Sequence, residues 1–144
     1  AVQGIEPGGG LMRVSEKVVE DYGLGKAGVK LRAASEAGML ASLQRASTNQ
    51  QWIVVTAWSP HWMFQKWPMR YLKDPKGTFG GEEQIHAFGS KSFATKYPQA
   101  HDFVRRFKLD LADVEAIEHA GETGKNYEQA AKAFVEANPD KVKA

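Results

Sequence analysis

The stretch WIVVTAWSPHWMF, residues 52–64, decides how the rest of the sequence is interpreted. It opens with β-branched and apolar residues, a composition typical of a buried strand. Pro60 ends that strand, because proline lacks the N–H group that a central strand donates. Trp58, His61 and Trp62 therefore fall at or just past the C-terminal end of the strand, where open α/β sheets bind ligands. The face of an indole ring attracts cations, so this position favours a binding site.

The residues before this stretch predict two strand–helix units. A short strand over residues 2–5 precedes a turn over 6–10 that is rich in Gly and Pro, and apolar residues then recur at helical spacing as far as Tyr22. A second strand over 29–31 precedes a helix for which Ser35 is the N-cap. The order strand, helix, strand, helix, strand favours a parallel sheet with right-handed crossovers.

The pattern changes after residue 64. Residues 69–72 and 85–88 are compatible with short strands, and a turn at 74–77 separates them. From Ser92 onward the sequence predicts helices to the end of the chain. The expected helix starts are Pro98 in a first turn, Asp110 or Asp113, and Asn126 as an N-cap with Gln129 three residues on.

Composition and charge exclude several classes of function. The 144 residues are 42% hydrophobic and 25% charged, which is ordinary for a soluble globular chain. The net charge of +2 provides no strong field for nucleic acid or an anionic membrane. The sequence has no cysteine, so disulfides and thiolate chemistry are excluded. It has neither an apolar run of about 20 residues that would cross a bilayer nor a signal peptide, and we expect it to begin inside a longer chain.

The glycine-rich turn at residues 4–10 is a candidate anion site, because free N–H groups at a helix N-terminus attract anions and glycine lets a ligand approach the backbone. The alternative is a plain strand-to-helix turn. Ser35 opens the next helix at the end of the second strand, so we expect it near the same cleft. From the turn itself the expected ligand-binding residues are Gly4, Ile5, Glu6 and Gly9.

Two sequence blocks together resemble a known family. The first is WSPHWMF at 58–64 followed by YLKDPK at 71–76, and the second is GIEPGGG at 4–10. In this order they resemble the glycine betaine/proline-type substrate-binding proteins of ABC transporters. The similarity runs from Gly4 almost to the C-terminus, yet it covers only about half of a complete binding protein.

The resemblance implies an α/β fold like that of type II periplasmic binding proteins, with two lobes around a cleft and a sheet dominated by parallel strands. Residues 1–82 would form an α/β ligand-binding lobe. Residues 83–144 would supply a crossover strand and a C-terminal helical segment that packs on the second lobe, whose remaining part is absent from this chain. We place the boundary near residues 80–84.

The resemblance also assigns roles within the site. Trp58 would form one aromatic wall around a quaternary ammonium, and His61 would donate a hydrogen bond to the ligand carboxylate. An alternative for His61 is a solvent-facing or supporting side chain. Some relatives carry an aromatic residue in the glycine-rich turn, where this sequence has glycine at 8–10, so the cage is incomplete in this lobe. We assign the remaining aromatic residues of this region to packing: Trp52, Trp62, Phe64 and Trp67.

The implied function is that of the solute-binding component of an ABC importer. Its ligand would be a small zwitterion or related compound such as glycine betaine, proline betaine, a choline-like compound or proline, and its partner the membrane permease. We expect a periplasmic or other extracytoplasmic location, no catalysis, no cofactor, no metal and no nucleic acid. We also expect the chain by itself to self-associate.

Two other classes of function stay open at this point. One is a small hydrolase-like enzyme with His61 as general base beside Glu6, although the sequence has no Gly-x-Ser-x-Gly motif. The other is a single-stranded nucleic-acid module that stacks bases on its Trp residues. The histidines at 86, 101 and 119 show no metal-ligand spacing, so no metal site is expected.

Overall fold

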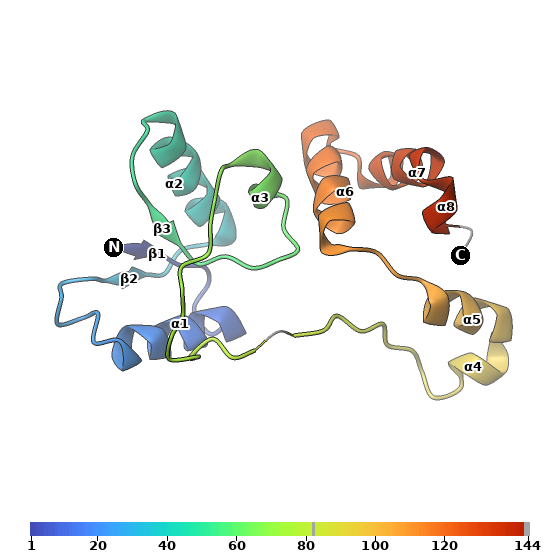
Figure 1. Ribbon diagram of the computed structural model, residues 1–144, viewed down its shortest axis with the longest axis horizontal. Helices are drawn as coiled ribbons and strands as arrows, with labels where there is room; N and C mark the ends of the chain where they lie inside the picture. Colours follow the sequence, from blue (N-terminus) through green and yellow to red (C-terminus); the bar gives the residue numbers. More distant parts are fainter. Residues whose placement is uncertain (82, 143–144) are drawn as a thin grey trace. The chain divides into compact units, whose positions relative to one another are not determined.

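The computed structural model describes residues 1–81 and 83–142, which divide into two compact units (Figure 1). The first unit comprises Ala1–Trp58 and Arg70–Glu82, and the second comprises Ser59–Met69 and Glu83–Ala144. Residue 82, at the expected lobe boundary, and residues 143 and 144 lie outside the described residues. Residues 59–69, which we expected in the first lobe, are therefore grouped with the C-terminal helices.

A parallel three-stranded sheet lies at the centre of the first unit. Its order is β2-β1-β3, so the first strand in the sequence is the middle one. Val2 pairs with Leu31 on one side and with Val54 on the other. This is the parallel arrangement that the alternating strand–helix order predicts. The strands are β1 (Val2–Gln3), β2 (Leu31–Arg32) and β3 (Val54–Val55).

The strand β3 is much shorter than residues 52–58 predicted. Trp52 precedes its first ladder residue and is 96% exposed, so the assignment of Trp52 to packing is wrong. The physical reason is that β3 lies at the edge of the sheet and pairs only with β1 among the described residues. A residue beyond the end of an edge strand has no neighbouring chain on the sheet to cover it.

Two helices complete the core of the first unit. They are α1 (Gly10–Asp21) and α2 (Glu36–Thr48). Met12 of α1 and Met39 and Leu43 of α2 are buried, as their helical spacing predicts. The predicted N-cap is confirmed, because the side chain of Ser35 accepts a hydrogen bond from the N–H of Gly38 at 3.1 Å.

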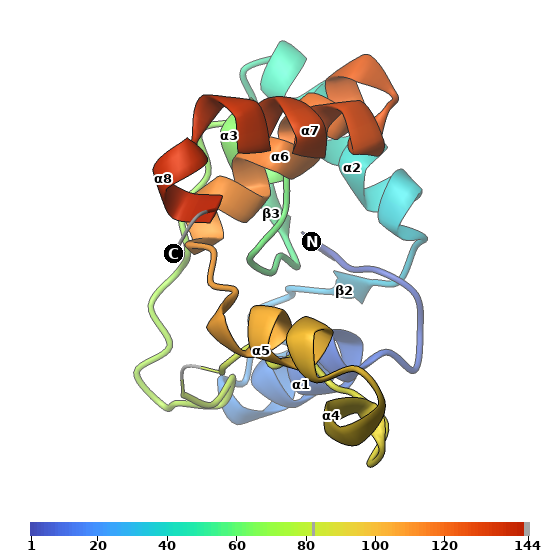
Figure 2. The same ribbon diagram turned by 90° about the vertical axis from the view of Figure 1, so that its right-hand side faces the viewer.

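The described part of the second unit is helical. The elements are α3 (Met63–Lys66), α4 (Phe93–Lys96), α5 (Pro98–Arg106), α6 (Leu111–Gly124), α7 (Tyr127–Ala137) and α8 (Pro139–Val142). Helix α6 packs against α3 and α7, and α4 packs against α5 (Figure 2). Met63 and Trp67 are buried, which explains why the short helix α3 groups with this unit. Burial of Trp67 confirms its predicted packing role.

The predicted helix starts are confirmed in this unit. Pro98 stands in the first turn of α5. Asp110, rather than Asp113, occupies the N-cap position of α6. The side chain of Asn126 accepts a hydrogen bond from the N–H of Gln129 at 2.9 Å and so caps α7. No helix among the described residues has the length and apolar composition to span a membrane.

Two strand predictions are wrong. Residues 69–72 and 85–88 adopt no regular structure, and Leu72, Ile85 and Phe88 are exposed. Neither segment pairs with another strand among the residues that the structure describes. A strand is stabilised by ladder hydrogen bonds to a neighbour, so apolar alternation without a partner strand is not sufficient to form one.

Candidate functional site

The carboxyl edge of the sheet gathers most of the predicted site residues. Because the three strands are parallel, the segments after Gln3, Arg32 and Val55 leave the sheet at the same edge. Two hydrogen bonds tie the first two of these segments together: Gly4 N to Arg32 O at 2.7 Å and Ala34 N to Ile5 O at 3.2 Å. The predicted residues that lie in this unit are Gly4, Ile5, Glu6, Gly9, Ser35 and Trp58.

Gly4 has a packing role that does not depend on a ligand. It is buried, and a Cβ atom at this position would lie 2.5 Å from Sδ of Met12 and 3.2 Å from the carbonyl oxygen of Arg32. Only glycine avoids these contacts, so the absence of a side chain lets α1 approach the start of the turn closely.

The side chains of Glu6 and Ser35 both accept hydrogen bonds from the N-terminus of α2. Oε1 of Glu6 accepts a hydrogen bond from the N–H of Glu36 at 3.0 Å, while Ser35 caps Gly38. The hydrogen bond from Glu36 lowers the pKa of the Glu6 carboxyl below its ordinary value. The anion at the α2 N-terminus is therefore the chain's own carboxylate, and Glu6 links the first loop to the second helix.

The N-terminus of α1 differs from that of α2 because no side chain in the described part of the chain caps it. The N-cap residue is Gly9, which has no side-chain oxygen to offer. Gly8 before it has a φ of +86°, a left-handed conformation that favours glycine. The first-turn N–H groups of α1 are thus left available to an external acceptor such as a carboxylate.

Trp58 belongs to the first unit, and His61 belongs to the second, which begins at the next residue after Trp58. Trp58 is half-buried, and His61 is buried. Nδ1 of His61 accepts a hydrogen bond from the N–H of Met63 at 3.1 Å. An accepting Nδ1 carries no hydrogen, which leaves Nε2 as the donor of a neutral imidazole. The solvent-facing alternative for His61 is therefore wrong.

The aromatic residues after His61 form a small cluster with a lysine. The ring centroids of Trp62 and Trp67 are 5.5 Å apart. Nζ of Lys66 lies 5.3 Å from the Trp62 ring and 4.7 Å from the Trp67 ring. These two indoles already have a cation of the chain itself as a partner, which supports their assignment to packing. Phe64 is half-buried.

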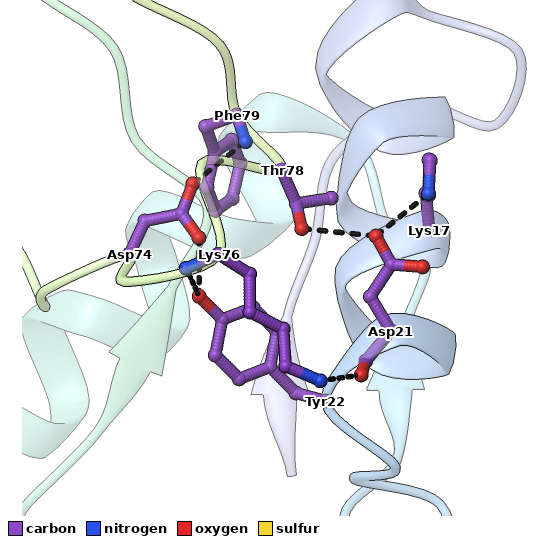
Figure 3. A network of polar contacts seen from close by, with 7 residues as sticks. All are labelled: Lys17, Asp21, Tyr22, Asp74, Lys76, Thr78 and Phe79. Carbon is purple, nitrogen blue, oxygen red and sulfur yellow. Dashed lines mark hydrogen bonds and ion pairs between the residues drawn. The ribbon is translucent and has the colours of Figure 1, made fainter.

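A polar network anchors the turn at residues 74–79, which begins within the YLKDPK segment, to the end of α1 (Figure 3). The hydroxyl of Tyr22 donates to Oδ1 of Asp74 and accepts from the N–H of Lys76 at 2.8 Å. Oδ2 of Asp21 accepts from the hydroxyl of Thr78 at 2.9 Å and pairs with Lys17 at 2.6 Å. The YLKDPK block thus has a structural role in the first unit.

The binding residues predicted from the sequence do not include Thr56, which follows β3 directly. It is 6% exposed, and its hydroxyl has no hydrogen-bond partner among the described residues. The available signal was its place at the strand end two residues before Trp58. For metals, the residues described by the structure contain no group of three or more His, Asp or Glu side chains arranged to hold an ion.

The sequence matches a family model along almost its whole length. The model is OpuAC, the substrate-binding domain of ABC-type glycine betaine transport systems, and it matches residues 1–137. The chain belongs to this family. The resemblance that the two sequence blocks indicated is therefore confirmed.

Relatives in this family share the sequence and the fold. GbuC, a glycine betaine/carnitine transport binding protein of Listeria monocytogenes, is 35% identical over 141 residues, which are 98% of this chain and 47% of GbuC. Lactococcal OpuAC, in its closed conformation with glycine betaine, has 37% identity and a TM-score of 0.84 over 99% of this chain and 56% of that one. The ProX protein of Borrelia burgdorferi, from a glycine betaine, L-proline ABC transporter, has 31% identity and a TM-score of 0.77. The match covers 99% of this chain and 54% of that one.

These comparisons confirm the fold class. The structural neighbours are type II periplasmic binding proteins, and this chain spans about half the length of the relatives that it matches. The family is one of substrate-binding domains, and its match gives no support to the hydrolase or nucleic-acid alternatives.

Proposed function

We propose that this chain is part of the solute-binding component of an ABC importer for glycine betaine or a related quaternary ammonium compound. The observation that carries the proposal is the family match over residues 1–137. The names of the relatives add two points: GbuC is a glycine betaine/carnitine transport binding protein, and lactococcal OpuAC was crystallised with glycine betaine. The candidate ligands are glycine betaine, proline betaine, choline-like compounds and proline.

Different groups of the chain would bind the two charged ends of the ligand. A methylated ammonium has no N–H to donate, so the indole face of Trp58 is a suitable partner for it. The carboxylate would lie at the carboxyl edge of the sheet, where the backbone of Gly4, Ile5 and Gly9 leads into the uncapped N-terminus of α1. His61 would assist by donating from Nε2, since its Nδ1 is an acceptor.

Glu6 and Ser35 would support the site from behind. Their side chains bind the N-terminus of α2, so they hold the loops after β1 and β2 together. The same geometry argues against Glu6 as an enzymatic partner of His61, because its carboxylate is engaged by a backbone N–H group. We therefore propose binding without catalysis, and no cofactor or metal has a role in it.

The proposal extends to place and partner. A binding component of an importer meets its ligand outside the cytoplasm, so we propose a periplasmic or other extracytoplasmic location. Its macromolecular partner would be the membrane permease of the same transporter. Residues 1–82 would belong mainly to one lobe and residues 83–144 mainly to the other. The chain spans about half the length of its relatives, so the second lobe would need further sequence to be complete.

Calorimetric titration tests the proposal directly. The protein to use is a receptor of the relatives' full length that contains this chain, titrated with glycine betaine, proline betaine, choline and proline. Glycine, which lacks the methyl groups, and tetramethylammonium, which lacks the carboxylate, are matched controls. We expect glycine betaine to bind more tightly than either control. Absence of binding by every quaternary ammonium compound would reject the proposed function.

A further inference from the structure

The hydroxyl of Thr56 is a buried polar group that the packing of the first unit does not explain. Thr56 is the first residue after β3, and its N–H donates to the carbonyl of Gln3 at 2.8 Å. Only 6% of the residue is exposed, and Oγ1 has no hydrogen-bond partner within the described residues. Nearly all buried hydroxyls in proteins find a partner, because burial without one destabilises the fold. Valine would fill the same volume without that disadvantage.

The ladder between β1 and β3 opens beside this hydroxyl. Gln3 is paired with Val55, and the bond from Thr56 N to Gln3 O is the last one between the two segments. The next bond of a regular parallel ladder would join the N–H of Ile5 to the carbonyl of Thr56. That bond is not formed, and the Ile5 N–H has no acceptor among the described residues.

Among the described residues, two donors without partners therefore lie at the end of the β1–β3 ladder, one from the backbone of Ile5 and one from the side chain of Thr56. Both belong to segments that leave the sheet at its carboxyl edge, Ile5 after β1 and Thr56 after β3. A carboxylate has two oxygens and accepts several hydrogen bonds at once, so it is the group that matches such a pair of donors. Neither donor attracts the methyl groups of an ammonium.

We infer that Thr56 is a further ligand-binding residue, whose hydroxyl donates to the carboxylate of a bound zwitterion beside the N–H of Ile5. This inference rests on the proposed function and adds a specific contact to the same site. It assigns the preference for a carboxylate partly to a side chain. The backbone donors of the glycine-rich turn are present whatever side chain stands at 56, whereas this hydroxyl is removed by one substitution.

The test compares Thr56→Val with Thr56→Ser in a receptor of full family length that contains this chain. Valine keeps the shape and removes the donor, while serine keeps the donor and removes a methyl group. Glycine betaine affinity is measured by calorimetry, and urea unfolding without ligand is measured in parallel. We expect Thr56→Val to weaken binding about tenfold or more, as for a hydrogen bond to a charged group, and Thr56→Ser to retain it within about threefold.

The unfolding measurement separates binding from folding. If the hydroxyl is unpaired without ligand, Thr56→Val leaves the unfolding midpoint unchanged or higher, even though affinity falls. Equal affinities of the Val variant and the parent would overturn the role of Thr56, and so would equal losses in the Val and Ser variants. A parent receptor that does not bind glycine betaine at all would instead reject the proposed function itself.

Discussion

The hydroxyl of Tyr22 donates a hydrogen bond to Oδ1 of Asp74, a residue 52 positions later in the chain (Figure 3). The other carboxylate oxygen of Asp74 accepts from the N–H of Phe79 at 2.7 Å, and Nζ of Lys76 lies 4.9 Å from the Tyr22 ring. The turn that contains Asp74 is thereby fixed to the end of α1. This contact explains why residues 70–81 remain with the first unit after the chain has contributed residues 59–69 to the second.

The first prediction concerns Tyr22. Tyr22→Phe removes the donor to Asp74 and the acceptor for the N–H of Lys76 but keeps the ring. We expect a lower urea midpoint of unfolding, because Asp74 loses a charge-assisted hydrogen bond. Tyr97→Phe is the matched control, since Tyr97 is 61% exposed. Equal midpoints for Tyr22→Phe and the control would contradict the anchoring role.

The second prediction concerns pH and Glu6. The N–H of Glu36 lowers the folded-state pKa of the Glu6 carboxyl below the ordinary value of about 4.3. The stabilisation is therefore complete above the unfolded-state pKa and is lost as pH falls through the lower, folded-state pKa. Glu6→Gln should be less stable than the parent at pH 7, and the difference should disappear in acid. Urea unfolding from pH 7 downward measures it; a difference that is independent of pH would contradict the assignment.

The third prediction concerns Gly4. Gly4→Ala places a Cβ 2.5 Å from Sδ of Met12, so the side chain or the backbone has to move. We expect a loss of about 1–3 kcal/mol in the free energy of unfolding, as for an overpacked core. Gly10→Ala is the control, because the residue is helical and, apart from its chain neighbours and its own helix backbone, no described atom lies within 4 Å of a Cβ there. Thermal and urea unfolding should show the loss in the first variant alone.

The fourth prediction concerns Trp58. In a receptor of full family length, Trp58→Ala should weaken glycine betaine binding by about 2 kcal/mol, roughly a thirtyfold loss, because one face of the ammonium cage is removed. Trp52→Ala, at a side chain that is 96% exposed, should bind like the parent. Calorimetry on both variants decides the matter, and unchanged affinity in Trp58→Ala would remove this residue from the site.

The fifth prediction concerns the 144-residue chain by itself. Its second unit exposes large apolar side chains, among them Phe88 at 95%, Phe103 at 53% and Phe107 at 56%. Exposed apolar surface of this kind favours association. We expect concentration-dependent self-association in sedimentation velocity and weak or undetectable glycine betaine binding, because one tryptophan wall is not a complete cage. A monomer that binds glycine betaine in the micromolar range would contradict both expectations.

The sequence by itself determined the family, the parallel sheet and the helices apart from the short α3, which was not predicted. These features depend on local patterns: β-branched runs, helical spacing of apolar residues, and side chains such as Ser35 and Asn126 that cap the helix directly after them. The glycine-rich turn and the Trp58–His61 block are also local, so their resemblance to the family could be recognised without knowledge of the fold.

The tertiary structure decided which groups are already engaged and which are left without a partner. Only the folded chain shows that Glu6 binds the N-terminus of α2 and that a side chain at position 4 would collide with Met12. It also shows that the buried hydroxyl of Thr56 has no hydrogen-bond partner among the described residues. It also shows that residues 85–88 form no strand among the described residues, despite their composition. The physical reason is that these properties arise from neighbours that are distant in sequence, and periodicity contains no information about them.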